Sequence, residues 1–91
     1  PVNPGEIALV IEIADSSLTY DLGRKAAKYA SYGIAEYWVL DVKARQTHVL
    51  TEPAEGAYHA ATAVPFEAEL KPHRLPRVSL TIASLRGIPA A

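Results

Sequence analysis

The apolar positions of the chain form four strand-like runs and one stretch with helical spacing. The first run, residues 7–14 (IALVIEIA), is β-branched and continuous except for Glu12. A short run of this kind between turn residues predicts a strand that is buried on both faces. A carboxylate in such a strand is costly unless it is paired, protonated or bound to a metal. Glu12 is therefore the first candidate for chemistry.

A helix is predicted to follow this strand. Ser16 and Ser17 are typical N-cap residues, and Gly33 is well placed to end the helix in a left-handed conformation. Apolar residues recur between them at intervals of three or four: Leu18, Leu22, Ala26, Tyr29 and Ala30. This spacing is typical of one face of an amphipathic helix, so we expect a helix of about 15 residues.

Three further strands are predicted after the helix. Residues 34–42 (IAEYWVLDV) form a second continuous run and predict another buried strand. Residues 46–51 alternate in character and predict a strand with one solvated side. Residues 57–63 are expected to pair with it as a hairpin, across a loop at residues 53–56.

The C-terminal part of the chain offers little regular structure. Three prolines interrupt it: Pro65, Pro72 and Pro76. Residues 78–85 are compatible with a strand or a short closing helix. An N-cap at Ser79, with Ile82 and Leu85 facing inward, favours the helix.

The order of these elements predicts an α/β fold. Two strands joined by a helix form a right-handed parallel pair, and the hairpins that follow extend the sheet in antiparallel fashion. The expected architecture is a mixed β-sheet with flanking helices. A chain of 91 residues is long enough for one such domain and no more.

Composition narrows the classes of function. The net charge is −1, so no overall basicity indicates nucleic-acid binding, although a local groove can be basic on a neutral protein. The absence of cysteine excludes disulfides, thiolate metal sites and cysteine nucleophiles, and it favours a cytoplasmic location. No apolar run reaches the ~18–20 residues that cross a bilayer, so no membrane partner is expected.

Three residues stand out as a candidate catalytic group. Asp21 and Lys25 are four residues apart on the predicted helix, and the turn before it folds Lys25 back toward Glu12. Carboxylates with a lysine suit metal-dependent phosphodiester hydrolysis. The same spacing also fits an ordinary solvated ion pair, so it leaves both interpretations open.

Other polar residues carry weaker signals. Glu6 lies on the face of Glu12 but roughly 20 Å away at ~3.3 Å per residue, too far to share a metal ion. His48 is predicted to point outward, and His59 and His73 are isolated, so no zinc-ligand spacing is present. The sequence contains no glycine-rich phosphate loop.

These motifs resemble the Uma2 family of restriction-endonuclease-like proteins over residues 4–88. The resemblance rests on five segments in this order: LVIEIADSS (9–17), YDLGRK (20–25), YA (29–30), GIAEYWVLD (33–41) and LPRVSL (75–80). It implies a fold like the PD-(D/E)XK restriction endonucleases. It also implies cleavage of DNA phosphodiester bonds with Mg²⁺ or Mn²⁺, with Glu12 as a metal ligand.

The resemblance also assigns roles residue by residue. The nuclease class places a lysine two residues after the second acidic position, but here that position is Ala14. Lys25 is similar to a relocated form of that lysine, and Asp21 matches the supporting aspartate of the family helix. The first aspartate of the class would lie before Pro1.

The chain is therefore expected to be the C-terminal part of a nuclease domain that is truncated at its N-terminus. We expect it to be inactive by itself, with DNA as the partner of its parent. The alternative is a catalytically silent module with a nuclease fold that binds DNA or a protein, or that forms a homodimer through its sheet.

Overall fold

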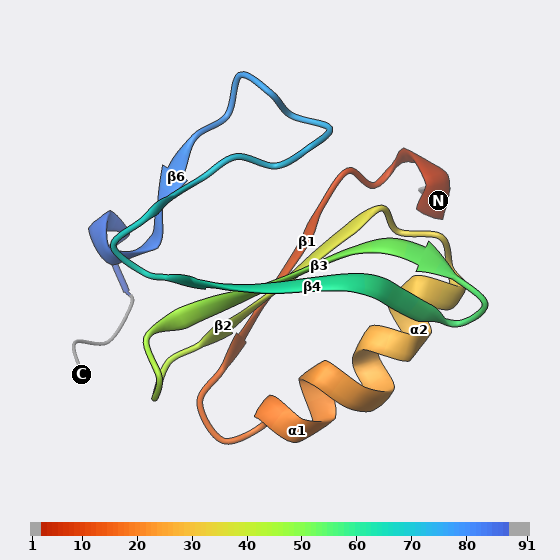
Figure 1. Ribbon diagram of the computed structural model, residues 1–91, viewed down its shortest axis with the longest axis horizontal. Coiled ribbons are helices and arrows are strands. Elements are labelled where there is room, and N and C mark those ends of the chain that lie inside the picture. Colours follow the sequence, from red (N-terminus) through yellow and green to blue (C-terminus); the bar gives the residue numbers. More distant parts are fainter. Residues whose placement is uncertain (1–2, 88–91) are drawn as a thin grey trace.

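A four-stranded sheet in the order β1–β2–β3–β4 forms the centre of the molecule (Figure 1). The computed structural model describes residues 3–87. The strands are β1 (Val10–Ala14), β2 (Glu36–Asp41), β3 (Gln46–Ala54) and β4 (Ala57–Pro65). β1 and β2 are parallel, and the other neighbouring pairs are antiparallel. The predicted α/β fold with a mixed sheet is thus confirmed.

One helical rod connects β1 to β2 and covers one face of the sheet. It consists of α1 (Leu18–Tyr20), a π-helical turn η2 (Asp21–Lys25) and α2 (Ala26–Ser31). The predicted end is confirmed, since Gly33 follows the last turn with a φ of 74°. The π-helical turn is not expected from the apolar spacing, and such turns are frequent at functional sites.

Two apolar cores lie on opposite faces of the sheet. The core under the helix contains buried residues of β1, α2, β2 and β3: Ala14, Ala26, Tyr37, Val39 and Leu50. The second core lies under the C-terminal segment: Trp38, Leu40, Phe66, Leu70 and Ile82. Every residue of β2 is buried, as its continuous apolar run predicts. Figure 1 shows the helix on one side of the sheet and β6 on the other.

The C-terminal segment combines the two structures that its sequence allows. It contains β5 (Glu69–Leu70), β6 (Leu80–Thr81) and a 3-10 turn, η3 (Ile82–Ser84). Ile82 is fully buried as expected, whereas Leu85 is 42% exposed, so the prediction that Leu85 faces inward is wrong. The turn is too short to bring both side chains to one face.

The first strand differs from its prediction in length and in burial. Residues 4–6 form a 3-10 turn, η1 (Pro4–Glu6), and only the later part of the run is a strand. Ile11 and Ile13 are 43% and 58% exposed. β1 lies at the edge of the sheet, and neither isoleucine belongs to the second core. The expectation of burial on both faces is therefore wrong.

The β3–β4 hairpin is longer than predicted. Its strands are joined by Glu55 and Gly56 alone, with φ angles of 53° and 74°. Two residues with positive φ form the kind of tight turn that matches the twist of a hairpin. β3 also lacks the solvated side predicted for it, because Leu50 is buried under the helix and Thr47 on the opposite face.

Within residues 3–87, no helix is long and apolar enough to cross a membrane.

Candidate active site

Glu12 occupies the middle of β1 on the side that faces the helix. Its strand neighbours on that side, Val10 and Ala14, pack in the core under the helix. In the parallel register, Glu12 lies beside Val39 of β2. The side chain of Glu12 keeps 27% of its surface exposed, so the carboxylate lies at the margin of this core and not inside it.

Lys25 contacts this carboxylate directly. Its Nζ lies 3.2 Å from Oε1 of Glu12 and 3.6 Å from Oδ1 of Asp21. The hydrogen bond to Glu12 raises the pKa of Lys25 above its ordinary value of 10.5, and the negative charges of both carboxylates act in the same direction. Lys25 is therefore a protonated cation held between two carboxylates. The structure brings together the three residues singled out from the sequence.

Asp21 is the most deeply buried of these three residues, with 3% of its side chain exposed. The hydroxyl of Ser17 donates a 2.7 Å hydrogen bond to Oδ2, while Lys25 lies against Oδ1. Both oxygens of Asp21 are thus engaged within the protein. Ser17 occupies the predicted N-cap position but makes no capping hydrogen bond to the backbone, because its hydroxyl binds Asp21 instead.

Two tyrosines that sequence reasoning assigned to the core also contribute to the cluster. The hydroxyl of Tyr29 donates a 3.0 Å hydrogen bond to Oε1 of Glu12. Burial raises the pKa of Tyr29 above 10.0, and its hydrogen bond to Glu12 acts in the same direction. Tyr29 follows Lys25 by four residues and so shares its helix face, but an aromatic residue on an apolar stripe usually fills a core.

Tyr37 anchors the π-helical turn to the sheet. Its buried hydroxyl donates a 2.9 Å hydrogen bond to the main-chain carbonyl of Asp21. Its ring meets that of Tyr29 edge-on, with centroids 5.0 Å apart. Burial raises the pKa of Tyr37 well above its ordinary value, so the hydroxyl is a neutral donor at physiological pH. The turn that carries Asp21 and Lys25 is thus tied to β2.

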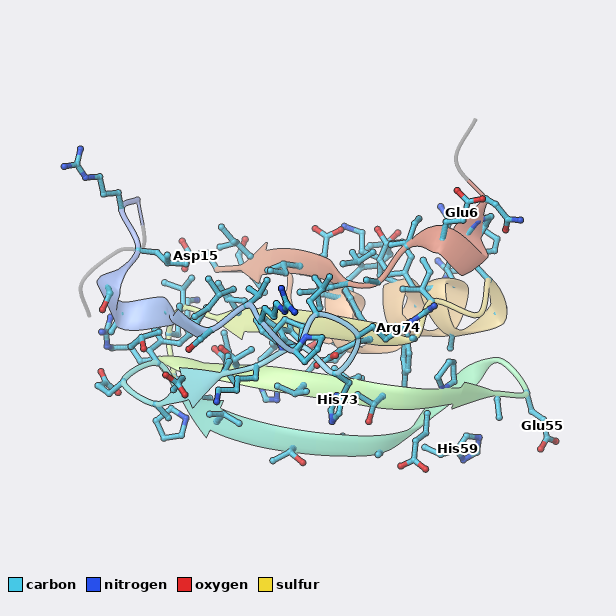
Figure 2. All side chains as sticks on the ribbon, turned by 90° about the horizontal axis from the view of Figure 1, so that it is seen from above. Glu6, Asp15, Glu55, His59, His73 and Arg74 are labelled. Carbon is cyan, nitrogen blue, oxygen red and sulfur yellow. The ribbon has the colours of Figure 1, made fainter. Side chains whose placement is uncertain are left out.

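Glu6 does not take part in the cluster. It lies exposed in η1, and Figure 2 shows it at the opposite end of the molecule from Asp15, which follows β1. Because η1 lies outside β1, the expectation that Glu6 shares a strand face with Glu12 is wrong, and its distance from Glu12 stays a prediction.

The histidines occupy three separate surroundings. The prediction that His48 points outward is wrong, because the sheet register aligns it with Val39 and its Nε2 lies 3.2 Å from Oδ2 of Asp41. His59 is exposed, with its Nε2 2.9 Å from the carbonyl of Ala54. Figure 2 shows His59 near the hairpin turn and His73 away from it, so the labelled pair does not converge.

Glu36 is a buried carboxylate that sequence reasoning missed. It is 1% exposed, and it accepts hydrogen bonds from Nε1 of Trp38 at 2.7 Å and from the main-chain N–H of His73 at 2.8 Å. A shallow hollow of about 280 Å³ lies beside it, lined also by Thr51 and Glu52. Since Glu36 joins β2 to the C-terminal segment and shares the second core's face with Trp38, its contacts are structural.

A comparison with models of protein families shows to which family the chain belongs. The model of the Uma2 family, described as "Putative restriction endonuclease", matches residues 2–83. The chain belongs to the Uma2 family. No curated protein and no solved structure matches it. The match spans the four-stranded sheet and the helical rod, so it includes every residue of the cluster around Glu12.

Membership of the Uma2 family raises the question of whether the side chains around Glu12 can bind a divalent metal ion. These side chains provide one clear metal ligand. Among residues 3–87, no three acidic or histidine side chains are grouped as a metal site. Both contacts of the Glu12 carboxylate involve Oε1, and no partner within the described residues contacts Oε2. Mg²⁺ is often held by one or two carboxylates together with water and substrate phosphate. Oε2 of Glu12 therefore fits a single position in such a coordination shell.

Proposed function

We propose that this Uma2 chain carries part of the active site of a DNA endonuclease that depends on Mg²⁺ or Mn²⁺. The observation that carries the proposal is the contact between Lys25 on the helix and Glu12 on the strand, 3.2 Å apart at an accessible margin of the core. A carboxylate and an ammonium group at one site suit a reaction in which a cation and a phosphate must be held together.

Each residue of the cluster has a distinct role in this proposal. Glu12 binds the metal through Oε2, and Lys25 places its positive charge beside the scissile phosphate. Asp21 keeps the Lys25 side chain extended toward Glu12, because its own oxygens are held by Ser17 and Lys25. When bound, the metal would lower the pKa of the attacking water and offset negative charge on the phosphate.

Of the two carboxylates in the cluster, only Glu12 has an oxygen that no described residue contacts, because both oxygens of Asp21 are held by Ser17 and Lys25. A single carboxylate holds a divalent metal only weakly, because water and substrate phosphate must supply the rest of the coordination shell. We therefore propose that the 91-residue chain does not cleave DNA by itself. An additional acidic ligand has to come from outside the described cluster.

A second candidate function is a nuclease-fold module without catalysis that binds DNA or a protein. The observation that favours it is the single ligand just described, together with a net charge of −1. If this module forms a homodimer through its sheet, a second copy of the chain would pair with β1. This strand lies at the edge of the sheet, and its residues Ile11 and Ile13 are exposed. Light scattering coupled to size exclusion distinguishes a monomer from this dimer.

Plasmid cleavage tests the nuclease proposal. The longest natural protein that contains this sequence should be assayed with Mg²⁺ or Mn²⁺, beside Glu12→Gln and Lys25→Ala. Two matched controls come from neighbouring positions: Glu6→Gln, which is exposed before β1, and Lys28→Ala, which is exposed on α2. We expect loss of cleavage in the first pair and parental cleavage in the controls. Equal cleavage by all four variants contradicts the assignment.

A further inference from the structure

Oε1 of Glu12 receives two hydrogen-bond donors from the helix. One is the ammonium group of Lys25 at 3.2 Å, and the other is the hydroxyl of Tyr29 at 3.0 Å. The two residues are one helical turn apart and approach the same oxygen. A carboxylate held in this way has little freedom to rotate, so the direction of its other oxygen is fixed as well.

The two donors differ in how they respond to a bound cation. A metal ion on Glu12 repels the ammonium group of Lys25, because like charges a few ångströms apart interact unfavourably even in water. The hydroxyl of Tyr29 is neutral and does not suffer this repulsion. Once a cation is present, Tyr29 is therefore the donor that can keep its contact with Oε1 while Lys25 turns toward a phosphate.

We propose that Tyr29 is a positioning residue that holds the Glu12 carboxylate so that Oε2 is presented to a divalent cation. The inference rests on the proposed nuclease function and adds a residue to it. Carboxylates that bind metals are commonly oriented by hydrogen bonds of their own, and loss of such a partner typically costs about 10–100-fold in metal affinity or activity.

The hydroxyl of Tyr29 can be tested separately from its ring, because the two make different contacts. The ring meets Tyr37 edge-on, with centroids 5.0 Å apart, and Tyr37 in turn holds the carbonyl of Asp21. Substitution by phenylalanine keeps this ring contact and removes only the donor to Glu12. The π-helical turn and the contacts of Asp21 are expected to remain in place in Tyr29→Phe.

Paramagnetic titration of the chain with Mn²⁺ tests the inference without a cleavage assay. In the ¹⁵N–¹H spectrum of the 91-residue chain, Mn²⁺ broadens amide signals near the bound ion, so one titration gives both its location and its affinity. We expect broadening centred on Glu12 in the parent. Tyr29→Phe should weaken this binding about tenfold. Tyr32→Phe, a control on the exposed tyrosine that follows α2, should bind as the parent does.

The possible outcomes distinguish the inference from the function on which it rests. Parental affinity in Tyr29→Phe, with broadening still centred on Glu12, overturns the role of Tyr29 and leaves the proposed metal site standing. Broadening that is centred elsewhere, or that persists unchanged in Glu12→Gln, overturns the metal site and the role of Tyr29 with it. A tenfold loss in Tyr29→Phe but not in Tyr32→Phe supports both.

Discussion

The ammonium group of Lys25 lies 3.2 Å from the carboxylate of Glu12, although one residue belongs to a helix and the other to a strand. The contact spans the junction between the two elements, next to the core that joins them. Surface ion pairs contribute little to stability, typically 0–1 kcal/mol. The support that Asp21 and Tyr29 give to this pair is consistent with the proposed chemical role.

Removal of the Lys25 charge should have opposite effects on metal binding and on cleavage. In Lys25→Met, the carboxylate of Glu12 loses the cation that competes with a metal ion. A repulsion of about 1 kcal/mol corresponds to roughly fivefold tighter Mn²⁺ binding. Cleavage by the longest natural protein should nevertheless be lost, because the positive charge beside the phosphate is gone.

Lys28→Met is the matched control, since Lys28 is exposed on α2. It should leave both quantities unchanged. Weaker Mn²⁺ binding in Lys25→Met would show that the lysine supports the metal site by some means other than competition for Glu12.

Substitution of Asp21 should lower the stability of the fold. The side chain is buried, and Asp21→Ala leaves the hydroxyl of Ser17 and the ammonium group of Lys25 without this partner. Loss of a buried hydrogen-bonding group costs about 1–3 kcal/mol in the free energy of unfolding. Urea denaturation measures this change. Asp15→Ala, at an exposed position just after β1, should change the free energy by less than about 0.5 kcal/mol.

The sequence predicted the elements of the fold well, because their signals are local. The largely apolar run that contains β2, the three-and-four spacing of the helix and the glycine at its end each appear within a short window. The exposure of Ile11 and Ile13 could not be predicted in this way. Their apolar run looks like that of a central strand, and only the order of strands in the sheet makes β1 an edge.

Part of the candidate site was also predictable, because some of its residues are related by local spacing in the sequence. Lys25 and Asp21 are related by helical spacing, which a sequence displays, and the resemblance to Uma2 connected them to Glu12. The π-helical turn and the hydrogen bond from Tyr29 depend on how the helix lies against the sheet. An aromatic residue on an apolar helix stripe usually fills a core, so its hydroxyl gave no separate signal.

Glu36 should prove to be a structural residue with no direct part in the chemistry. Glu36→Ala removes the acceptor for Nε1 of Trp38 and for the main chain of His73, so it should lower the free energy of unfolding by about 2–3 kcal/mol. Trp38 is the only tryptophan in the chain, so its fluorescence reports this change directly. Mn²⁺ broadening at Glu12 should remain at temperatures where the variant is folded. Glu6→Ala serves as the exposed control.

The free energy of unfolding should fall in strongly alkaline solution, and the ionisation of Tyr58 should be one cause. Burial raises the pKa of Tyr58 from 10.0 to about 12, and its hydroxyl donates a 2.7 Å hydrogen bond to the carbonyl of Ile34. Between these two pH values, an unfolded chain releases the proton and the folded chain retains it. The free energy of unfolding therefore falls as pH rises through this window, whereas below pH 10 this tyrosine adds no pH dependence.

Urea denaturation at several pH values from 8 to 12, in Tyr58→Phe and in the parent, isolates this contribution. The raised pKa values of Lys25, Tyr29 and Tyr37 also cause stability to fall at alkaline pH, and these three groups are present in both proteins. Tyr58 itself raises the pKa of Tyr37, so the comparison includes this smaller effect as well. The alkaline decline should be shallower in Tyr58→Phe, by up to about 1.4 kcal/mol per pH unit. Tyr20→Phe, at a position 53% exposed, should decline as the parent does. Parallel declines in Tyr58→Phe and the parent would mean that Tyr58 ionises in the folded protein as readily as in the unfolded chain.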